Sequence, residues 1–142
     1  MDIFGVKLLY QRLISYMFGQ SGKYSEDELG VILKIFMILN QILRLNEDLE
    51  KIENEETRQK IEKDLTNTIC NNSVLSQLSE GVDSIIEESR RNKGQVNQAY
   101  IVEDNSLQLF KEKMIRQDER FNLLQQNIER ILRIIENQSQ DN

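Results

Sequence analysis

Carboxylates are the residues of this chain that most resemble a chemical motif. They gather in two acidic runs, residues 47–50 and 53–56, and in the pair Glu87-Glu88. Glutamates on neighbouring helices of a bundle can hold a two-metal centre, but that motif also requires histidine, and the chain contains none. The spacing of an EF-hand calcium loop is absent as well. We therefore interpret the runs as solvated helix faces and predict no catalytic residue, no metal ligand and no cofactor.

Nucleophilic catalysis has no support in the residue types either. Without histidine, neither a Ser-His-Asp triad nor a Cys-His pair can form. The only cysteine, Cys70, excludes an intrachain disulfide and a CxxC metal site. Because most such cysteines are buried and inert, we expect Cys70 to be a small buried residue beside Ile69. A reactive thiol is the alternative interpretation.

Phosphate and nucleic-acid binding are indicated only by weak motifs. Gly19 and Gly22 do not make a P-loop, because the G-K-[ST] ending of that motif is missing. Basic residues form two clusters, Arg90, Arg91 and Lys93, and then Lys111, Lys113, Arg116 and Arg120. The second cluster alternates with acidic residues, which is typical of a solvated face with salt bridges. A net charge of −6 opposes binding to phosphates. A role as a nucleic-acid or ribonucleoprotein accessory factor is therefore only an alternative to the main interpretation.

The elements that carry these residues are predicted to be helices. The chain has 142 residues, 39% apolar and 30% charged, which is enough for a folded domain. It contains no proline, and because proline breaks helices, its absence predicts an all-α protein, a helical bundle or hairpin. No signal peptide or membrane span is recognisable in the sequence. The expected location is therefore the cytoplasm.

The first predicted helix covers residues 2–18, where apolar residues recur at helical spacing. We expect it to pack in the core against the second helix, because it lacks the strongly charged face of a surface-seeking helix. The alternative is a peripheral membrane protein anchored by residues 3–18. Lys7 and Arg12 would then point toward anionic headgroups.

The second predicted helix has the clearest start in the chain. Residues 25–28 form a capping box, in which Ser25 and Glu28 exchange hydrogen bonds with each other's backbone amides. Tyr24 and Leu29 occupy the positions of a hydrophobic staple. The body of the helix, residues 31–45, is apolar on nearly every side, which is typical of a central helix.

Three further segments are candidates for breaks between helices. Residues 54–57 offer the first, without a strong helix breaker. Residues 66–73 are poor in helix formers, and Asn72 or Ser73 can cap a new helix, so one long helix and two shorter ones both remain open. Residues 90–95 form the best predicted loop. Gly81 weakens its helix by about 1 kcal/mol relative to alanine.

The last third of the chain carries the strongest pattern, a heptad repeat that continues without a slip over five heptads. It predicts a long coiled-coil helix over residues 106–138, whose apolar face must be buried by another helix. Gln117 is a polar core position that can fix the register. Four-helix bundles use the same spacing, but the length of about 50 Å favours a partner chain. The predicted interface residues are Leu107, Phe110, Met114, Gln117, Phe121, Leu124, Ile128, Ile131 and Ile135.

These patterns predict a bundle domain over residues 1–105, a coiled-coil helix over residues 106–138 and a frayed tail over residues 139–142. The expected function is non-enzymatic, that of an oligomerising scaffold or adaptor. It would pair through the heptads with itself, as a homodimer or homotrimer, or with another helical protein. On this hypothesis, replacing Ile128 and Ile131 with Asp separates the assembly and leaves the N-terminal core folded.

Overall fold

The computed structural model describes residues 2–17, 24–93 and 105–140, apart from the side chains of residues 16–17, 88–93, 105–107 and 139–140. Every regular element in this part of the chain is a helix, which confirms the predicted all-α class. The helices in these ranges are α1 (Ile3–Met17), α2 (Glu26–Glu50), α3 (Glu55–Asn71), α4 (Val74–Lys93), α5 (Asn105–Arg116) and α6 (Asp118–Gln140). None of the helices so described combines the length and apolarity that crossing a membrane requires.

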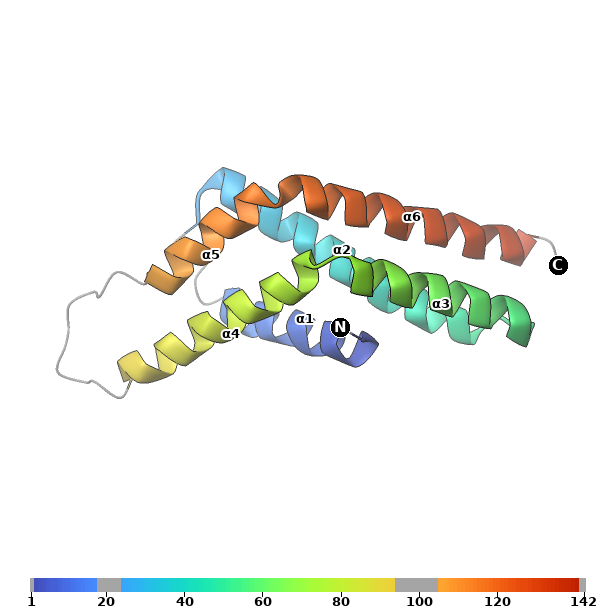
Figure 1. The fold of residues 1–142 in the computed structure, drawn as a ribbon, viewed down its shortest axis with the longest axis horizontal. Coiled ribbons are helices and arrows are strands. Elements are labelled where there is room, and N and C mark those ends of the chain that lie inside the picture. The colour runs from blue at the N-terminus through green and yellow to red at the C-terminus, as the bar shows by residue number, and fades with distance from the viewer. Residues whose placement is uncertain (1, 18–23, 94–104, 141–142) are drawn as a thin grey trace.

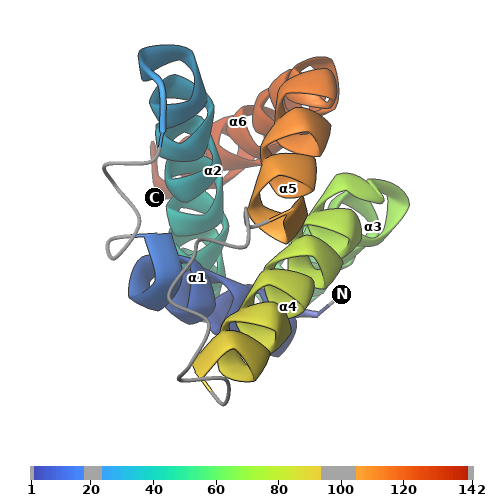
Figure 2. The same ribbon diagram turned by 90° about the vertical axis from the view of Figure 1, so that its left-hand side faces the viewer.

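The helices form an elongated bundle organised along α2, which has 25 residues and packs against α1, α3, α5 and α6. In Figure 1, α4 and α5 lie toward one end of the molecule and α3 and α6 toward the other. α4 packs on α5 and α1, while α3 packs on α6. Figure 2, which looks along the bundle, shows α2 at its edge, with the other helices below it and to one side.

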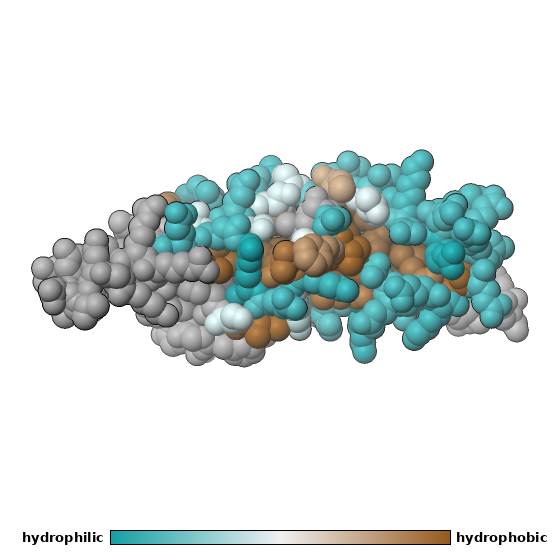
Figure 3. All heavy atoms as spheres, turned by 90° about the horizontal axis from the view of Figure 1, so that it is seen from below, coloured by the Kyte–Doolittle hydropathy of each residue, from teal (hydrophilic) through white to brown (hydrophobic). Residues whose placement is uncertain are grey.

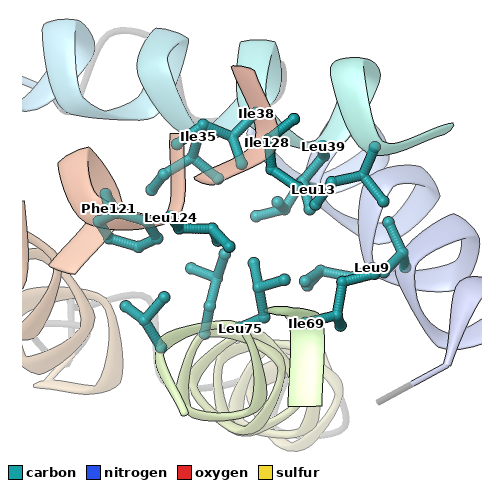
Figure 4. Close-up of a cluster of buried hydrophobic side chains, with 14 of the residues drawn as sticks. Leu9, Leu13, Ile35, Ile38, Leu39, Ile69, Leu75, Phe121, Leu124 and Ile128 are labelled. Carbon is teal, nitrogen blue, oxygen red and sulfur yellow. The ribbon is translucent and has the colours of Figure 1, made fainter. Parts of the chain in front are cut away.

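All six helices contribute to one hydrophobic core. Figure 4 shows side chains of α1, α2, α3, α4 and α6 pointing toward one another in its centre. The residues that α2 buries there are Ile32, Ile35, Ile38, Leu39, Ile42, Leu45 and Leu49. The same cluster continues from Val6 in α1 to Ile135 in α6, so the segments 1–105 and 106–138 share a single core.

The start of α2 confirms the predicted capping box. The backbone amide of Ser25 donates to Oε1 of Glu28 at 2.7 Å, and the amide of Glu28 donates to Oγ of Ser25 at 3.3 Å. Tyr24, one staple residue, is buried, and Leu29, the other, packs against the core. The local sequence therefore fixes where α2 begins.

The middle of the chain forms two helices rather than one. Asn54 caps α3, because its Oδ1 accepts from the amide of Thr57 at 3.1 Å. α3 ends at Asn71, and Oδ1 of Asn72 accepts from the amide of Val74 at 3.0 Å, at the start of α4. α4 then continues to Lys93, so the predicted loop over residues 90–95 is wrong for its first four positions. The glycine of that predicted loop, Gly94, lies outside the described residues.

The predicted single C-terminal helix is divided in two at Gln117. The amide of Gln117 donates both to the carbonyl of Lys113 at 3.2 Å and to that of Met114 at 3.3 Å. This shared hydrogen bond marks a local tightening of the helix, and Figure 1 shows α5 and α6 meeting at an angle there. The bend lets α5 follow α4 while α6 follows α2 and α3.

Candidate functional site

The heptad face predicted as the interface is buried inside the single chain. Gln117 is half-buried, and the side chain of Leu107 lies outside the described residues. The other predicted interface residues are all buried: Phe110, Met114, Phe121, Leu124, Ile128, Ile131 and Ile135. The helices that pack on this face are α4 and α2 along α5, and α2 and α3 along α6. In the folded chain, the face is therefore part of the core.

Polar contacts close the two flanks of α6. On one side, the guanidinium of Arg130 donates two hydrogen bonds to the carboxylate of Asp64 in α3, at 2.9 and 3.0 Å. On the other, Nζ of Lys34 in α2 lies 2.6 Å from Oδ1 of Asp118 and 2.9 Å from Oδ1 of Asn122. The hydrogen bonds from Arg130 lower the pKa of Asp64, against a smaller opposing effect of burial. These contacts hold α6 between α2 and α3.

Gln117, the polar residue of the heptad face, has its partner in the same chain. Its side-chain amide donates to Oε1 of Gln77 in α4. Nearby, Nδ2 of Asn72 donates to the carbonyl of Arg120 at 3.3 Å. The bend between α5 and α6 therefore lies beside the break between α3 and α4, and polar side chains link the two.

Gly81 has a packing role that the sequence pattern did not reveal. A Cβ added to Gly81 would lie 2.8 Å from Cδ2 of Phe110 and 3.4 Å from its Cε2. The ring of Phe110 thus occupies the space that any other residue at position 81 would need. The one sequence signal that could have pointed to this role was the presence of a glycine inside a helical pattern.

A small hollow between α4 and α5 surrounds this contact. Its walls include Val74, Leu78, Met114 and Phe121, and among the described residues that line it only Lys113 is ionisable. General acid–base catalysis needs a positioned acid and base, and this hollow does not supply such a pair. Within the described ranges, no group of three or more His, Cys, Asp or Glu residues is arranged to hold a metal ion.

Two expectations about single residues are wrong. Cys70 is exposed, because α3 turns Ile61, Leu65 and Ile69 inward, and the residue after Ile69 then faces outward. Lys111, expected on a solvated face, is buried. Its Nζ lies 3.7 Å from Oε2 of Glu28 and 5.0 Å from the ring centroid of Tyr24.

α1 packs in the core as expected. Its inward face buries Val6, Leu9 and Leu13 against α2 and α4. On its outer side Lys7 is exposed, whereas Arg12 forms an ion pair with Asp83 of α4. Contact of the inward face with a membrane would therefore require α1 to leave the bundle. The other basic cluster, Arg90, Arg91 and Lys93, has its side chains outside the described residues.

Large hydrophobic side chains remain exposed on the outside of the bundle. Figure 3 looks at the side on which α1 and α4 lie in Figure 1 and shows hydrophobic side chains in a band between hydrophilic ones. On this side a shallow groove between α1 and α4 is lined by Leu8, Arg12 and Ile86. The exposed large hydrophobic residues of the described chain are Phe4, Leu8, Leu33, Met37, Leu109, Ile115 and Leu123.

Comparison with known proteins identifies no relative. No model of a protein family matches the sequence, no curated protein matches it, and no solved structure matches the fold.

Proposed function

We propose that the protein is a non-enzymatic helical scaffold that acts by self-association through the outer faces of its bundle. One observation carries this proposal: large hydrophobic side chains stay exposed although the chain has already buried its heptad face. Leu33 is 68% exposed and Met37, four residues further along the same helix, is 47% exposed. Large apolar groups that lie next to each other on one helix face and stay exposed favour contact with another protein surface.

Pairing through the heptads is disfavoured as the mode of association. It would require α5 and α6 to leave α2, α3 and α4, which exposes the buried heptad residues to water. Each large apolar side chain contributes about 1.5–3 kcal/mol when it is fully buried. Seven of the predicted interface residues are buried in the single chain. Association through an outer face therefore costs less free energy, because it leaves these residues buried.

The test is the mass of the full chain in solution, measured by sedimentation equilibrium from low micromolar to several hundred micromolar protein. We expect the average mass to rise with concentration above the 16.8 kDa of one chain. A mass that stays at 16.8 kDa throughout would contradict self-association. That result would favour the other partner that the sequence allows, a helix of a different protein.

A further inference from the structure

The outer face of α2 carries a straight row of exposed residues. Successive members are four, three, four, three and four positions apart, so they follow one line along the helix surface. The row extends over about 27 Å, at about 1.5 Å per residue. Its members are Glu26, Gly30, Leu33, Met37, Asn40 and Arg44, all of them exposed.

This row is complementary to itself when it is turned end for end. A two-fold axis at the level of Ile35 places each residue of one helix opposite a different residue of an antiparallel copy. The pairs are Glu26 with Arg44, Gly30 with Asn40, and Leu33 with Met37. Opposite charges therefore meet at both ends, apolar side chains meet near the centre, and glycine meets an amide side chain.

We propose that α2 binds α2 of a second copy of this chain in antiparallel orientation, through the row from Glu26 to Arg44. The proposal rests on the proposed function and names its surface. A two-fold interface uses the same patch on both partners, so the patch must complement itself. The row on α2 meets that requirement in charge and in apolarity.

The charges at the two ends of the row are available for a partner. Within the part of the chain that the structure describes, neither Glu26 nor Arg44 forms an ion pair. By contrast, Lys34 on the flank of α2 is held by Asp118. Because charge complementarity chiefly fixes orientation and register, Glu26 and Arg44 select the antiparallel arrangement.

Gly30 allows the two helices to approach closely. A Cβ added there would meet no described atom within 4 Å, so nothing in the described chain requires a glycine at this position. Small residues let helix backbones come together, and the opposing Asn40 has the size to cover the space. Leu33 and Met37, 68% and 47% exposed, supply the apolar contact on either side of the axis.

The exposed apolar residues of α1 and α6 lack this pattern. The row on α1 that contains Phe4 and Leu8 continues with Gln11 and Ser15 and carries no charge that could set a register. The corresponding row on α6 carries charges of both signs, Glu119, Arg130 and Arg133, but its single apolar residue, Leu123, has no apolar residue to face in an antiparallel copy that pairs Glu119 with Arg133. In Figure 2, α2 lies at the edge of the bundle.

The experiment compares the dissociation constant of the full chain with those of matched variants by sedimentation equilibrium. Leu33→Asp is expected to weaken the dimer at least about tenfold, because it places a charge in the apolar centre. Leu123→Asp makes the same change at an exposed leucine of α6 and is expected to leave the constant within about twofold. Circular dichroism checks that both variants keep the helix content of the original chain.

A charge exchange tests the orientation. Arg44→Glu is expected to weaken the dimer at least about tenfold, because two glutamates then face each other at each end. The double variant, Arg44→Glu with Glu26→Arg, is expected to have a dissociation constant within about threefold of that of the original chain. Arg133→Glu on α6 serves as the control. In a parallel pair like residues would face each other, and the exchange would restore nothing.

The outcomes separate this surface from the wider proposal. If the chain self-associates but Leu33→Asp has no effect, or the double exchange is no better than Arg44→Glu alone, the α2 surface is wrong and the proposed function stands. If the chain is monomeric at every concentration, the proposed function fails, and this surface fails with it.

Discussion

Gly30 and Gly81 both lie inside helices, but their surroundings differ. Around Gly30 no described atom lies within 4 Å of an added Cβ, whereas at Gly81 the ring of Phe110 lies at 2.8 Å. Glycine in a helix is less favourable than alanine by about 0.5–1 kcal/mol. We therefore predict that Gly30→Ala raises the free energy of unfolding by about 0.5–1 kcal/mol. Urea unfolding at low protein concentration measures this change in the free energy of unfolding. A lower free energy of unfolding for Gly30→Ala would contradict the prediction.

For Gly81→Ala the prediction has the opposite sign. The new Cβ would force the buried ring of Phe110 to move, and overpacking of a core typically costs about 1–3 kcal/mol. This loss exceeds the gain in helix propensity, so the free energy of unfolding should fall. Combining Gly81→Ala with Phe110→Leu tests the cause. The double variant should lose less than the sum of the single losses, since the smaller side chain leaves room for the methyl group.

The pair of Asp64 and Arg130 gives the fold a dependence on pH. Hydrogen bonds from Arg130 hold the pKa of Asp64 below 3.8. As the pH falls, Asp64 therefore binds a proton in the unfolded chain at a higher pH than in the folded chain. The stabilisation is thus present above pH 3.8 and lost as pH falls below it. Both side chains are more than a third solvent-accessible, so solvent screening keeps the effect to about 0.2–1 kcal/mol.

Comparing the original chain with Asp64→Asn tests this dependence. Urea unfolding should show a difference between the two at neutral pH that shrinks below pH 3.8. Arg130→Gln should show the same pattern, because it removes the other partner. An equal difference at both pH values would indicate that Asp64 acts through packing rather than charge.

At the scale of elements, the capping box predicts a measurable contribution to α2. Replacing Ser25 with Ala removes the acceptor for the amide of Glu28, and loss of an N-cap typically costs about 1 kcal/mol. Thermal unfolding followed by circular dichroism measures this loss. Ser76→Ala, at an exposed position inside α4, is the control and should be neutral or slightly stabilising. Equal effects at the two positions would contradict the capping role.

Element boundaries were predictable where the signal is local. The start of α2 is encoded within four residues, Ser25 to Glu28, and the structure agrees with it. The bend at Gln117 could not be predicted, because the heptad spacing continues through it and no glycine or proline marks it. It results from packing, since α5 follows α4 while α6 follows α2 and α3.

The sequence also could not predict which helix covers the heptad face. A heptad pattern states which side chains are buried, and Phe121, Leu124 and Ile128 are indeed buried. It does not state whether the covering helix belongs to the same chain. Cys70 shows a related limit at smaller scale, because the sequence left open which of the neighbours Ile69 and Cys70 faces the core.

At the scale of the whole molecule, the shared core changes the expected effect of substitutions in the heptads. Ile128 and Ile131 are both 0% exposed, and they belong to the same cluster as the buried residues of α1 and α2. We therefore predict that replacing both with Asp unfolds the entire chain, because two charges cannot be buried there without partners.

Circular dichroism and thermal unfolding of this double variant would decide the point. Loss of most helical signal and of the cooperative transition is expected. Leu123→Asp, an exposed position on the same helix, should leave both unchanged. A double variant that keeps a cooperative transition would show that α1 to α4 fold without α6, as the sequence alone suggested.

The contact of α2 with α6 also has a consequence for synthesis on the ribosome. Lys34 and Asp118 are separated by 84 residues along the chain. At about 5–20 residues per second, that separation corresponds to roughly 4–17 s of translation. During this interval the apolar face of α2 has emerged while the helix that covers it has not yet been made. The nascent chain is therefore most exposed to aggregation, and most suited to a chaperone, just before its last third is complete.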